Sequence, residues 1–200
     1  MYYYNSLSIY LFSSNTLSTL CYNLAKHPNI QEKIHDEICS VLDENGGILD
    51  HETTTKFEYM EAAIDEDLRL FPPVTFLDRT CVKDVNIGNI KFQKGVNIGF
   101  PIWAIHRFHE NFEKPLEFMP ERFLKPMKDN INPYAYIPFG GGPRKCIGMR
   151  FAMVEMKLAL AKLIKTFKIV DVPKETNLNM IKGDSAFLSY NGVRVKLEAR

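Results

Sequence analysis

The feature that most constrains this chain is a glycine-rich turn that carries one cysteine into a long apolar helix. Three consecutive glycines, Gly140–Gly142, are followed by Pro143, two cationic residues and Cys146. Glycine lets a backbone adopt positive φ and pass close to a large flat object. The helix that follows, ending near Phe167, is apolar around most of its circumference, so we expect it to be deeply buried. A fold for this chain must therefore bury this helix and present the cysteine close to its beginning.

The position of Cys146 favours a reactive thiolate. It stands just before a helix N-terminus, where the helix dipole and the free N–H groups stabilise negative charge, and Arg144 and Lys145 add to this effect. A thiolate is a strong soft ligand for iron, and Arg144 is placed to pair with a carboxylate beside such a metal. The alternative is an unreactive core cysteine, which is our interpretation of the other three, Cys21, Cys39 and Cys81.

Hydrophobic periodicity predicts a mainly helical chain with small β-sheets, an α+β class. Residues 16–26 are expected to be the last turns of a helix, and two further helices are expected after Pro28 and over 58–70. Ile30, Ile34, Ile38 and Val41 form the buried stripe of the helix after Pro28. The stretch from Val85 to Phe100 is predicted to form strand, turn and strand. A hairpin is expected where Asn191-Gly192 joins 186–190 to 193–197.

Length, charge and cysteine spacing exclude several classes of protein. The 200 residues suffice for one domain, and a net charge of +1 gives no field that would attract nucleic acid. The cysteines form no C-x-x-C pair, which disfavours a zinc site or a disulfide framework. The first 25 residues carry no charged side chain, but polar residues interrupt every apolar run, so no membrane-spanning segment is expected.

The segment from Phe139 to Gly148 resembles the cysteine-loop signature of the cytochromes P-450, F-x-x-G-x-R-x-C-x-G, at every fixed position. The resemblance implies the C-terminal part of the P-450 fold and a bound haem b (iron protoporphyrin IX). It further implies that Cys146 is the axial iron ligand through its thiolate. By the same resemblance Arg144 binds a haem propionate, Phe139 shields the thiolate, and Gly148 belongs to the cofactor-binding loop.

A second match is Glu66-Asp67-Leu68-Arg69, which resembles the family's E-x-x-R. A surface ion pair between residues three apart on a helix is the alternative explanation. Pro120-Glu121-Arg122-Phe123 resembles the family's P-E-R-F block, and there the arginine, here Arg122, joins the pair in a buried triad. The resemblance thus assigns a structural role to Glu66, Arg69 and Arg122.

The stretch after the E-x-x-R helix also resembles the family. Arg79 matches a second propionate-binding arginine, for which the alternative is a solvent-exposed strand residue. Val74, Thr75, Phe76 and Leu77 match a segment that lines the substrate pocket. The resemblance extends from about Leu17 to Leu197 and is closest to the animal microsomal drug- and steroid-oxidising subfamily and its arthropod relatives.

The sequence departs from the family at the oxygen-activating motif, A-G-x-[DE]-T-[TS]. Counted back from His27-Pro28, its acid falls near Leu11 and its threonine near Phe12, so no catalytic residue is assigned. Ser13 and Ser14 are nearby hydroxyls but are not favoured as replacements. We interpret residues 1–200 as the C-terminal haem-binding portion of one domain, with 1–16 unplaced or an aberrant start, in a gene-model fragment or a truncated isoform.

The resemblance implies a monooxygenase that inserts one atom of dioxygen into a lipophilic substrate. Electrons would come from NADPH through a cytochrome reductase, with cytochrome b5 as a second candidate donor. Membrane association, at the cytosolic face of the endoplasmic reticulum, is expected for a full-length parent only. Two alternatives stay open: a truncated, inactive protein that binds haem or the reductase, and a fragment that does not fold alone, with exposed apolar surface.

Overall fold

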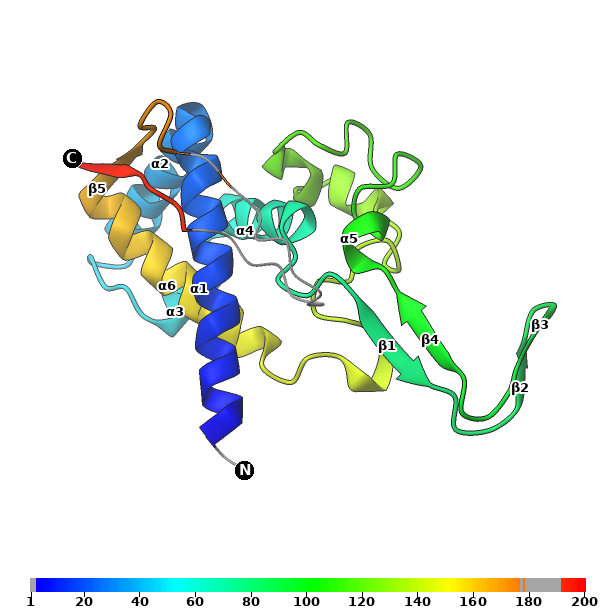
Figure 1. Ribbon diagram of the computed structural model, residues 1–200. Coiled ribbons are helices and arrows are strands. Elements are labelled where there is room, and N and C mark those ends of the chain that lie inside the picture. The colour runs from blue at the N-terminus through cyan, green and yellow to red at the C-terminus, as the bar shows by residue number, and fades with distance from the viewer. Residues whose placement is uncertain (1–2, 177, 179–191) are drawn as a thin grey trace.

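The structure, a computed structural model, describes residues 3–176, 178 and 192–200, with side chains from Phe12 onward. Long helices form a bundle on one side of the molecule, the strands between residues 77 and 100 and irregular segments extend from it on the other, and the two strands after residue 166 lie beside the helices (Figure 1). In chain order the elements are α1 (Tyr3–Lys26), α2 (Pro28–Glu44), α3 (His51–Thr54), α4 (Glu58–Leu70), β1 (Leu77–Thr80), β2 (Val85–Ile87), β3 (Ile90–Phe92), β4 (Asn97–Phe100), α5 (Ile102–Ile105), η1 (Pro120–Phe123), η2 (Met127–Asn130), η3 (Gly142–Arg144), α6 (Met149–Thr166), β5 (Phe167–Val170) and β6 (Lys196–Ala199).

Local sequence signals place most helix boundaries. Pro28 begins α2, where its missing N–H costs nothing, and the helix ends before Asn45-Gly46-Gly47. The predicted bounds of α4 are confirmed, as is the end of α6 before Phe167. Helix α1 spans Tyr3–Lys26, so the expectation that residues 16–26 are the last turns of a helix is confirmed, and polar residues near its start do not interrupt it.

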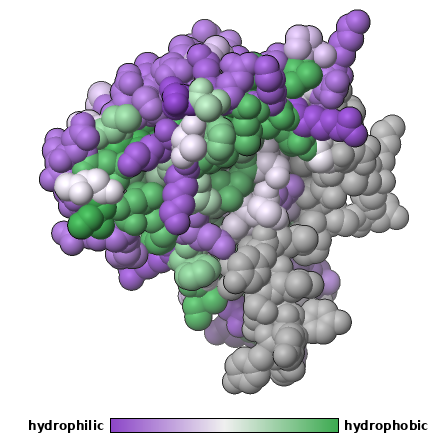
Figure 2. All heavy atoms as spheres, turned by 90° about the vertical axis from the view of Figure 1, so that its left-hand side faces the viewer, coloured by the Kyte–Doolittle hydropathy of each residue, from purple (hydrophilic) through white to green (hydrophobic). Residues whose placement is uncertain are grey.

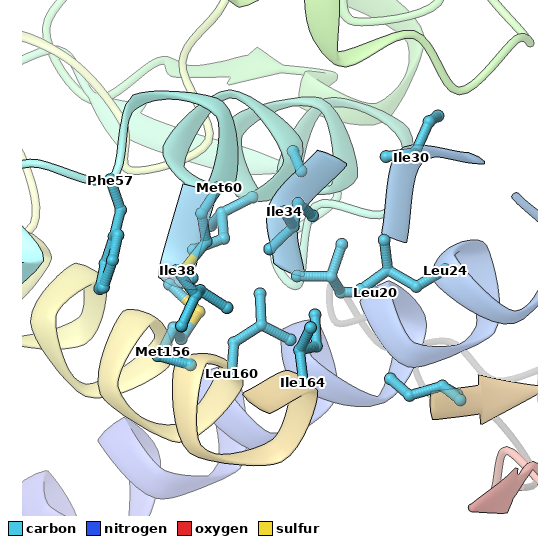
Figure 3. Close-up of a cluster of buried hydrophobic side chains, with 14 of the residues drawn as sticks. Leu20, Leu24, Ile30, Ile34, Ile38, Phe57, Met60, Met156, Leu160 and Ile164 are labelled. Carbon is cyan, nitrogen blue, oxygen red and sulfur yellow. The ribbon is translucent and has the colours of Figure 1, made fainter. Parts of the chain in front are cut away.

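Four helices supply the hydrophobic core. The predicted stripe of α2 is confirmed, because its members are buried toward the bundle. Figure 3 shows Ile34 and Ile38 from α2 facing Leu20 from α1 and Leu160 and Ile164 from α6. Apolar faces that converge in this way are removed from water, which is the main stabilising contribution of a bundle.

The prediction that α6 is buried on most sides is wrong. Its buried residues are Met156, Lys157, Leu160, Ala161 and Ile164, all on the face that packs against the bundle. Phe151 is 58% exposed and Ala159 is also exposed. Within the described residues the partners α1, α2, α3, α4 and β5 cover only part of the circumference, so the rest of the helix keeps contact with solvent.

The strands form three small antiparallel pairs. β1 pairs with β4, β2 with β3, and β5 with β6. The strand-turn-strand prediction for 85–100 is confirmed, whereas the strand predicted over 193–197 is wrong in its bounds: β6 covers Lys196–Ala199 and pairs with β5. The first arm of the predicted hairpin, together with Asn191, lies outside the described residues. The mainly α class with small β-sheets is confirmed.

Apart from the small sheets, the chain between α5 and α6 is largely irregular, with η1, η2 and η3 as single 3-10 turns. Among the described residues, no helix has both the length and the apolar character that crossing a bilayer requires.

Candidate functional site

A cavity lies where α1, the segment after α4, the glycine turn and the start of α6 meet. Its volume is about 230 Å³, many times the roughly 30 Å³ of one water molecule in the liquid. The lining is mostly apolar and includes Leu68, Pro73 and Met156. A space of this size and character suits a sizeable organic group rather than a bare ion.

The glycine turn brings Cys146 to the cavity wall. Gly140 and Gly142 have φ of 72° and 67°, a left-handed conformation that favours glycine over other residues. The turn is closed by the N–H of Cys146, which donates to the Phe139 carbonyl at 2.9 Å. Phe139, Cys146 and Gly148 all line the cavity, and Gly148 is the N-cap of α6. Cys146 is exposed, and its thiol is free.

Two arginines also line the cavity, from different parts of the chain. Arg79 lies on β1 and Arg144 at the end of η3, and both are exposed residues. Arg79 donates to the Asp78 carbonyl at 2.6 Å, and neither guanidinium has a carboxylate partner among the described residues. The two interpretations of Arg79 are thus not exclusive, because a solvent-exposed strand residue also faces the cavity.

The four residues from 74 to 77 divide between two environments. Val74 and Leu77 line the cavity. Thr75 and Phe76 are not part of its lining. The Phe76 ring lies against Gly99, so close that a Cβ built there would be 2.2 Å from the ring, and the Thr75 carbonyl accepts from the Trp103 N–H at 3.1 Å. The extended chain thus directs only part of this segment toward the cavity.

Helix α1 forms one wall of the cavity. Phe12, Ser13 and Thr16 line it, so an aromatic ring stands where the oxygen-activating threonine is expected. Thr16 donates to the Phe12 carbonyl at 3.1 Å. Ser13 is 5% exposed, and its hydroxyl has no hydrogen-bond partner within the part of the chain that the structure describes. A buried hydroxyl without a partner is costly, and a polar atom of a cavity occupant would satisfy it.

A buried ion network lies outside the cavity lining and connects α4 to η1. Glu66 and Arg69 are both 0% exposed, and the Arg69 Nε lies 2.7 Å from the Glu66 Oε2. Arg122 reaches the other carboxylate oxygen at 3.4 Å. All five N–H donors of Arg69 are used: two go to Glu66 and three to the carbonyls of His106, Pro115 and Glu117. Full pairing is what makes a buried guanidinium tolerable.

Sequence reasoning missed a second buried carboxyl, Asp67. It is 0% exposed and accepts hydrogen bonds of 2.6 Å from the Thr19 hydroxyl and the Asn23 amide, both on α1. Burial raises the pKa of Asp67 to about 8, although these two donors act in the opposite direction. The available sequence signal was weak, because Asp67 is one of several charged residues of this helix.

Lys157 stands apart from the other cations of this region, Lys145, Arg150, Lys162 and Lys165, which the sequence alone allows either as a basic face for a redox partner or as a solvated helix face. Lys157 is 5% exposed, and its ammonium donates to the Thr54 carbonyl at 2.9 Å and to the Glu61 carboxylate. It therefore joins α6 to α3 and α4. The other four are exposed.

Comparison with known proteins shows where this arrangement belongs. A family model described as Cytochrome P450 matches residues 13–196. The chain belongs to the cytochrome P450 family. It is 42% identical over 179 residues to Cytochrome P450 3A6 of Oryctolagus cuniculus, which covers 90% of this chain and 35% of that relative. It is 41% identical over 192 residues to Cytochrome P450 3A7 of Homo sapiens, covering 96% and 38%.

A third relative, Cytochrome P450 3A19 of Capra hircus aegagrus, is 40% identical over 84% of this chain and 77% of its own length. The chain spans little more than a third of the length of the first two relatives. The observed elements are thus the C-terminal part of the cytochrome P450 fold.

The cytochrome P450 family implies a haem bound through a cysteine thiolate, and the residues of the cavity fit such a group. The cavity offers apolar walls for a flat macrocycle and a free thiol at its edge. Two guanidiniums without carboxylate partners among the described residues suit the carboxylates that haem carries. The left-handed turn at Gly140 leaves a side chain out of this wall, where a Cβ would meet Leu77 at 3.4 Å.

Proposed function

We propose that this chain is the haem-binding portion of a monooxygenase that oxidises a lipophilic small molecule. The observation that carries the proposal is that Cys146, Phe139, Arg79 and Arg144 line one apolar cavity, although Arg79 stands 67 positions before the cysteine. Haem with a thiolate ligand supplies the activation of dioxygen and the transfer of one oxygen atom to the substrate.

Each residue of the cavity has a part in this function. Cys146 would provide the thiolate that holds the haem iron, and the Gly140 and Gly142 conformations hold its loop in place. Arg79 and Arg144 would bind the two propionates as charge-assisted pairs. Phe139, which packs against the hydrophobic core, would keep water from the sulfur.

Val74 and Leu77 would contact the substrate, because they form the apolar wall that follows α4. Thr75 and Phe76, which stand outside the lining, would act on the substrate only through their neighbours. Glu66, Arg69 and Arg122 would hold the fold on which the site depends, without contact to the reacting atoms.

Electrons would come from NADPH through a cytochrome reductase, with cytochrome b5 as a further donor, at the cytosolic face of the endoplasmic reticulum membrane. The exposed Lys145, Arg150, Lys162 and Lys165 support this assignment, because a basic surface complements an acidic donor. The two relatives are both named Cytochrome P450 3A. For this chain we propose only the class of substrate, a lipophilic small molecule.

The alternative is a protein that binds haem or the reductase without turnover. Phe12 favours it, because an aromatic ring in the cavity wall cannot deliver protons as the family's acid and alcohol do. Ser13 and Thr16 are the hydroxyls of α1 that reach the same cavity among its described residues.

The spectrum of the reduced carbon monoxide complex tests the proposal. We expect the red-shifted Soret band of a thiolate-ligated haem in the wild type and its complete loss in Cys146→Ala. Cys81→Ala is the matched control, because it removes another thiol that does not line the cavity, and its band should stay unchanged. A band that survives in Cys146→Ala contradicts the proposal.

Oxidation of a lipophilic substrate, driven by NADPH and added reductase, then separates the two functions. Product formation supports the monooxygenase. A thiolate band without any product supports the binding protein instead.

A further inference from the structure

His106, the C-cap of α5, is a buried titratable group that the proposed function leaves unexplained. It is 0% exposed and stands outside the cavity lining. Its ring is stacked on Tyr136, with ring centroids 5.5 Å apart and an interplanar angle of 29°. The imidazole therefore lies between the end of α4 and the segment that leads to the glycine turn.

Both ring nitrogens of His106 contact backbone groups of distant segments. The N–H of Ile137 lies 3.0 Å from Nε2, and the carbonyl of Arg69 lies 3.3 Å from Nδ1. A backbone N–H can only donate and a carbonyl can only accept, so Nε2 is the acceptor and Nδ1 carries the proton. The backbone of His106 adds a third bond, because its carbonyl accepts from the Arg69 guanidinium at 2.8 Å.

These bonds continue into the cysteine loop. The Ile137 carbonyl accepts from the N–H of Gly140 at 3.0 Å, and the Phe139 carbonyl accepts from the N–H of Cys146 at 2.9 Å. Tyr136, next to Ile137, is tied to α4 by its hydroxyl, which donates to Asp65 at 3.0 Å. A series of short contacts thus leads from the buried ion pair of Glu66 and Arg69 to the cysteine.

The electrostatic environment keeps the imidazole neutral, as this arrangement requires. Burial lowers the pKa of His106 to about 3, and the neighbouring cations Arg69 and Arg107 act in the same direction. Glu66, the one carboxylate of α4 bonded to Arg69, is itself held by two guanidiniums. Across physiological pH, Nε2 remains free to accept the Ile137 N–H.

We infer that His106 is a positioning residue that fixes the Cys146 loop to the Glu66–Arg69 network. It acts through Ile137 and does not touch the cavity. This inference rests on the proposed function for its purpose, since a rigid loop keeps the sulfur at one distance from a bound metal. His106 thereby connects the buried ion network, through hydrogen bonds, to the loop that carries Cys146.

Two substitutions at this position test the inference. His106→Gln can still present an acceptor to the Ile137 N–H, because its side-chain amide oxygen can replace the imidazole Nε2. His106→Phe keeps the ring stacked on Tyr136 but has no acceptor. His109→Gln, at an imidazole whose side chain is 78% exposed three residues further on, is the matched control.

The first measurements need no haem. Amide hydrogen exchange of Ile137 should be at least tenfold faster in His106→Phe than in the wild type, and close to wild type in His106→Gln and His109→Gln. Alkylation of Cys146 by iodoacetamide, mapped by mass spectrometry, should accelerate in the same variant. Unchanged exchange at Ile137 overturns the inference, and so does faster exchange with an unchanged Cys146 rate.

A measurement on the wild type covers the case in which the variants do not fold. Nitrogen-15 NMR of the imidazole should show a protonated Nδ1 and an unprotonated Nε2 at pH 7. The opposite tautomer, or an imidazolium, overturns the inference.

The carbon monoxide spectrum then separates this inference from the proposed function. In haem-loaded His106→Phe the thiolate band should fall to less than half of the wild-type fraction, with rescue by His106→Gln. If the wild type exchanges slowly at Ile137 but shows no thiolate band, the proposed function fails while the role of His106 in the loop stands.

Discussion

At the scale of single residues, Asp67 shows how a polar group is accommodated in the core. Its two partners, Thr19 and Asn23, are neutral, and no cation pairs with it among the described residues. Its pKa of about 8 means that the neutral carboxyl is the favoured form in the folded protein at pH 7. Because the pKa of this group differs between the folded and the unfolded state, the free energy of unfolding depends on pH, and this dependence can be measured.

We predict that the free energy of unfolding falls as the pH rises from 6.5 to 8.5. The pKa of Asp67 is about 8 in the folded state, above its ordinary value of 3.8. At pH values between 3.8 and 8 the folded protein therefore holds a proton that the unfolded chain has released, so each rise in pH favours unfolding until Asp67 itself ionises near pH 8. The slope should reach ~1 kcal/mol per pH unit, below the limit for one proton. Urea denaturation at a series of pH values measures it.

Asp67→Asn should flatten this dependence, because an amide does not titrate and can still bond to Thr19 and Asn23. Asp36→Asn, at a side chain that is 82% exposed, is the control and should leave the slope as in the wild type. A slope that persists in Asp67→Asn would show that another group is responsible.

At the scale of elements, the triad of Glu66, Arg69 and Arg122 joins α4 to η1. Glu66 also accepts from the Met119 N–H at 3.0 Å, and Arg122 donates to the Lys114 carbonyl at 2.8 Å. The network thereby fixes the irregular chain before η1 to α4. Removing one member leaves the others buried without compensation.

We predict that Glu66→Gln lowers the free energy of unfolding by about 3–5 kcal/mol, since it leaves two buried guanidiniums without their carboxylate. Chemical denaturation provides the measurement. Glu117→Gln is matched in spacing and substitution, because Glu117 pairs with Lys114 three residues away, but both side chains are about 60% exposed.

The control should change stability by less than ~1 kcal/mol, as is usual for surface ion pairs. Equal effects of the two substitutions would mean that the buried network contributes no more than a surface pair.

At the scale of the whole molecule, apolar side chains reach solvent in several places. Ile147, just before the N-cap of α6, is fully exposed, and on the β2–β3 hairpin Ile87 and Ile90 are 60% and 61% exposed. Figure 1 shows this hairpin projecting away from the helices. Figure 2 shows further apolar atoms among hydrophilic ones on the side of α2, α6 and β5. Exposed apolar side chains promote association where they form a contiguous patch.

We predict that the 200-residue chain self-associates in a concentration-dependent way. Ile87 and Ile90 are opposite each other in the β2–β3 register, so together they form one apolar patch. Changing both to Lys should shift the weight-average mass in analytical ultracentrifugation toward the monomer. Changing Asn86 and Asn89 to Lys is the control, because it adds the same charge to exposed positions of the same hairpin without removing an apolar side chain, and it should have a smaller effect.

The sequence by itself determined the boundaries of α2 and α4, the α2 stripe and the cysteine turn. It also determined the family, through a motif that spans only ten residues. These features depend on near neighbours: periodicity, proline and glycine positions, and turn chemistry. Nearly every residue that faces the cavity from 68 onward belongs to a segment that sequence reasoning had singled out.

Only the tertiary structure decided which buried polar groups meet. The partners of Asp67, the role of Lys157, the place of Ser13 in the cavity wall and the contact of His106 with Ile137 all join segments remote in sequence. Such pairings depend on how helices and loops pack in three dimensions, which local patterns do not encode. The burial of α6 was overestimated for the same reason. Its apolar sequence does not determine how many other helices and strands pack around it.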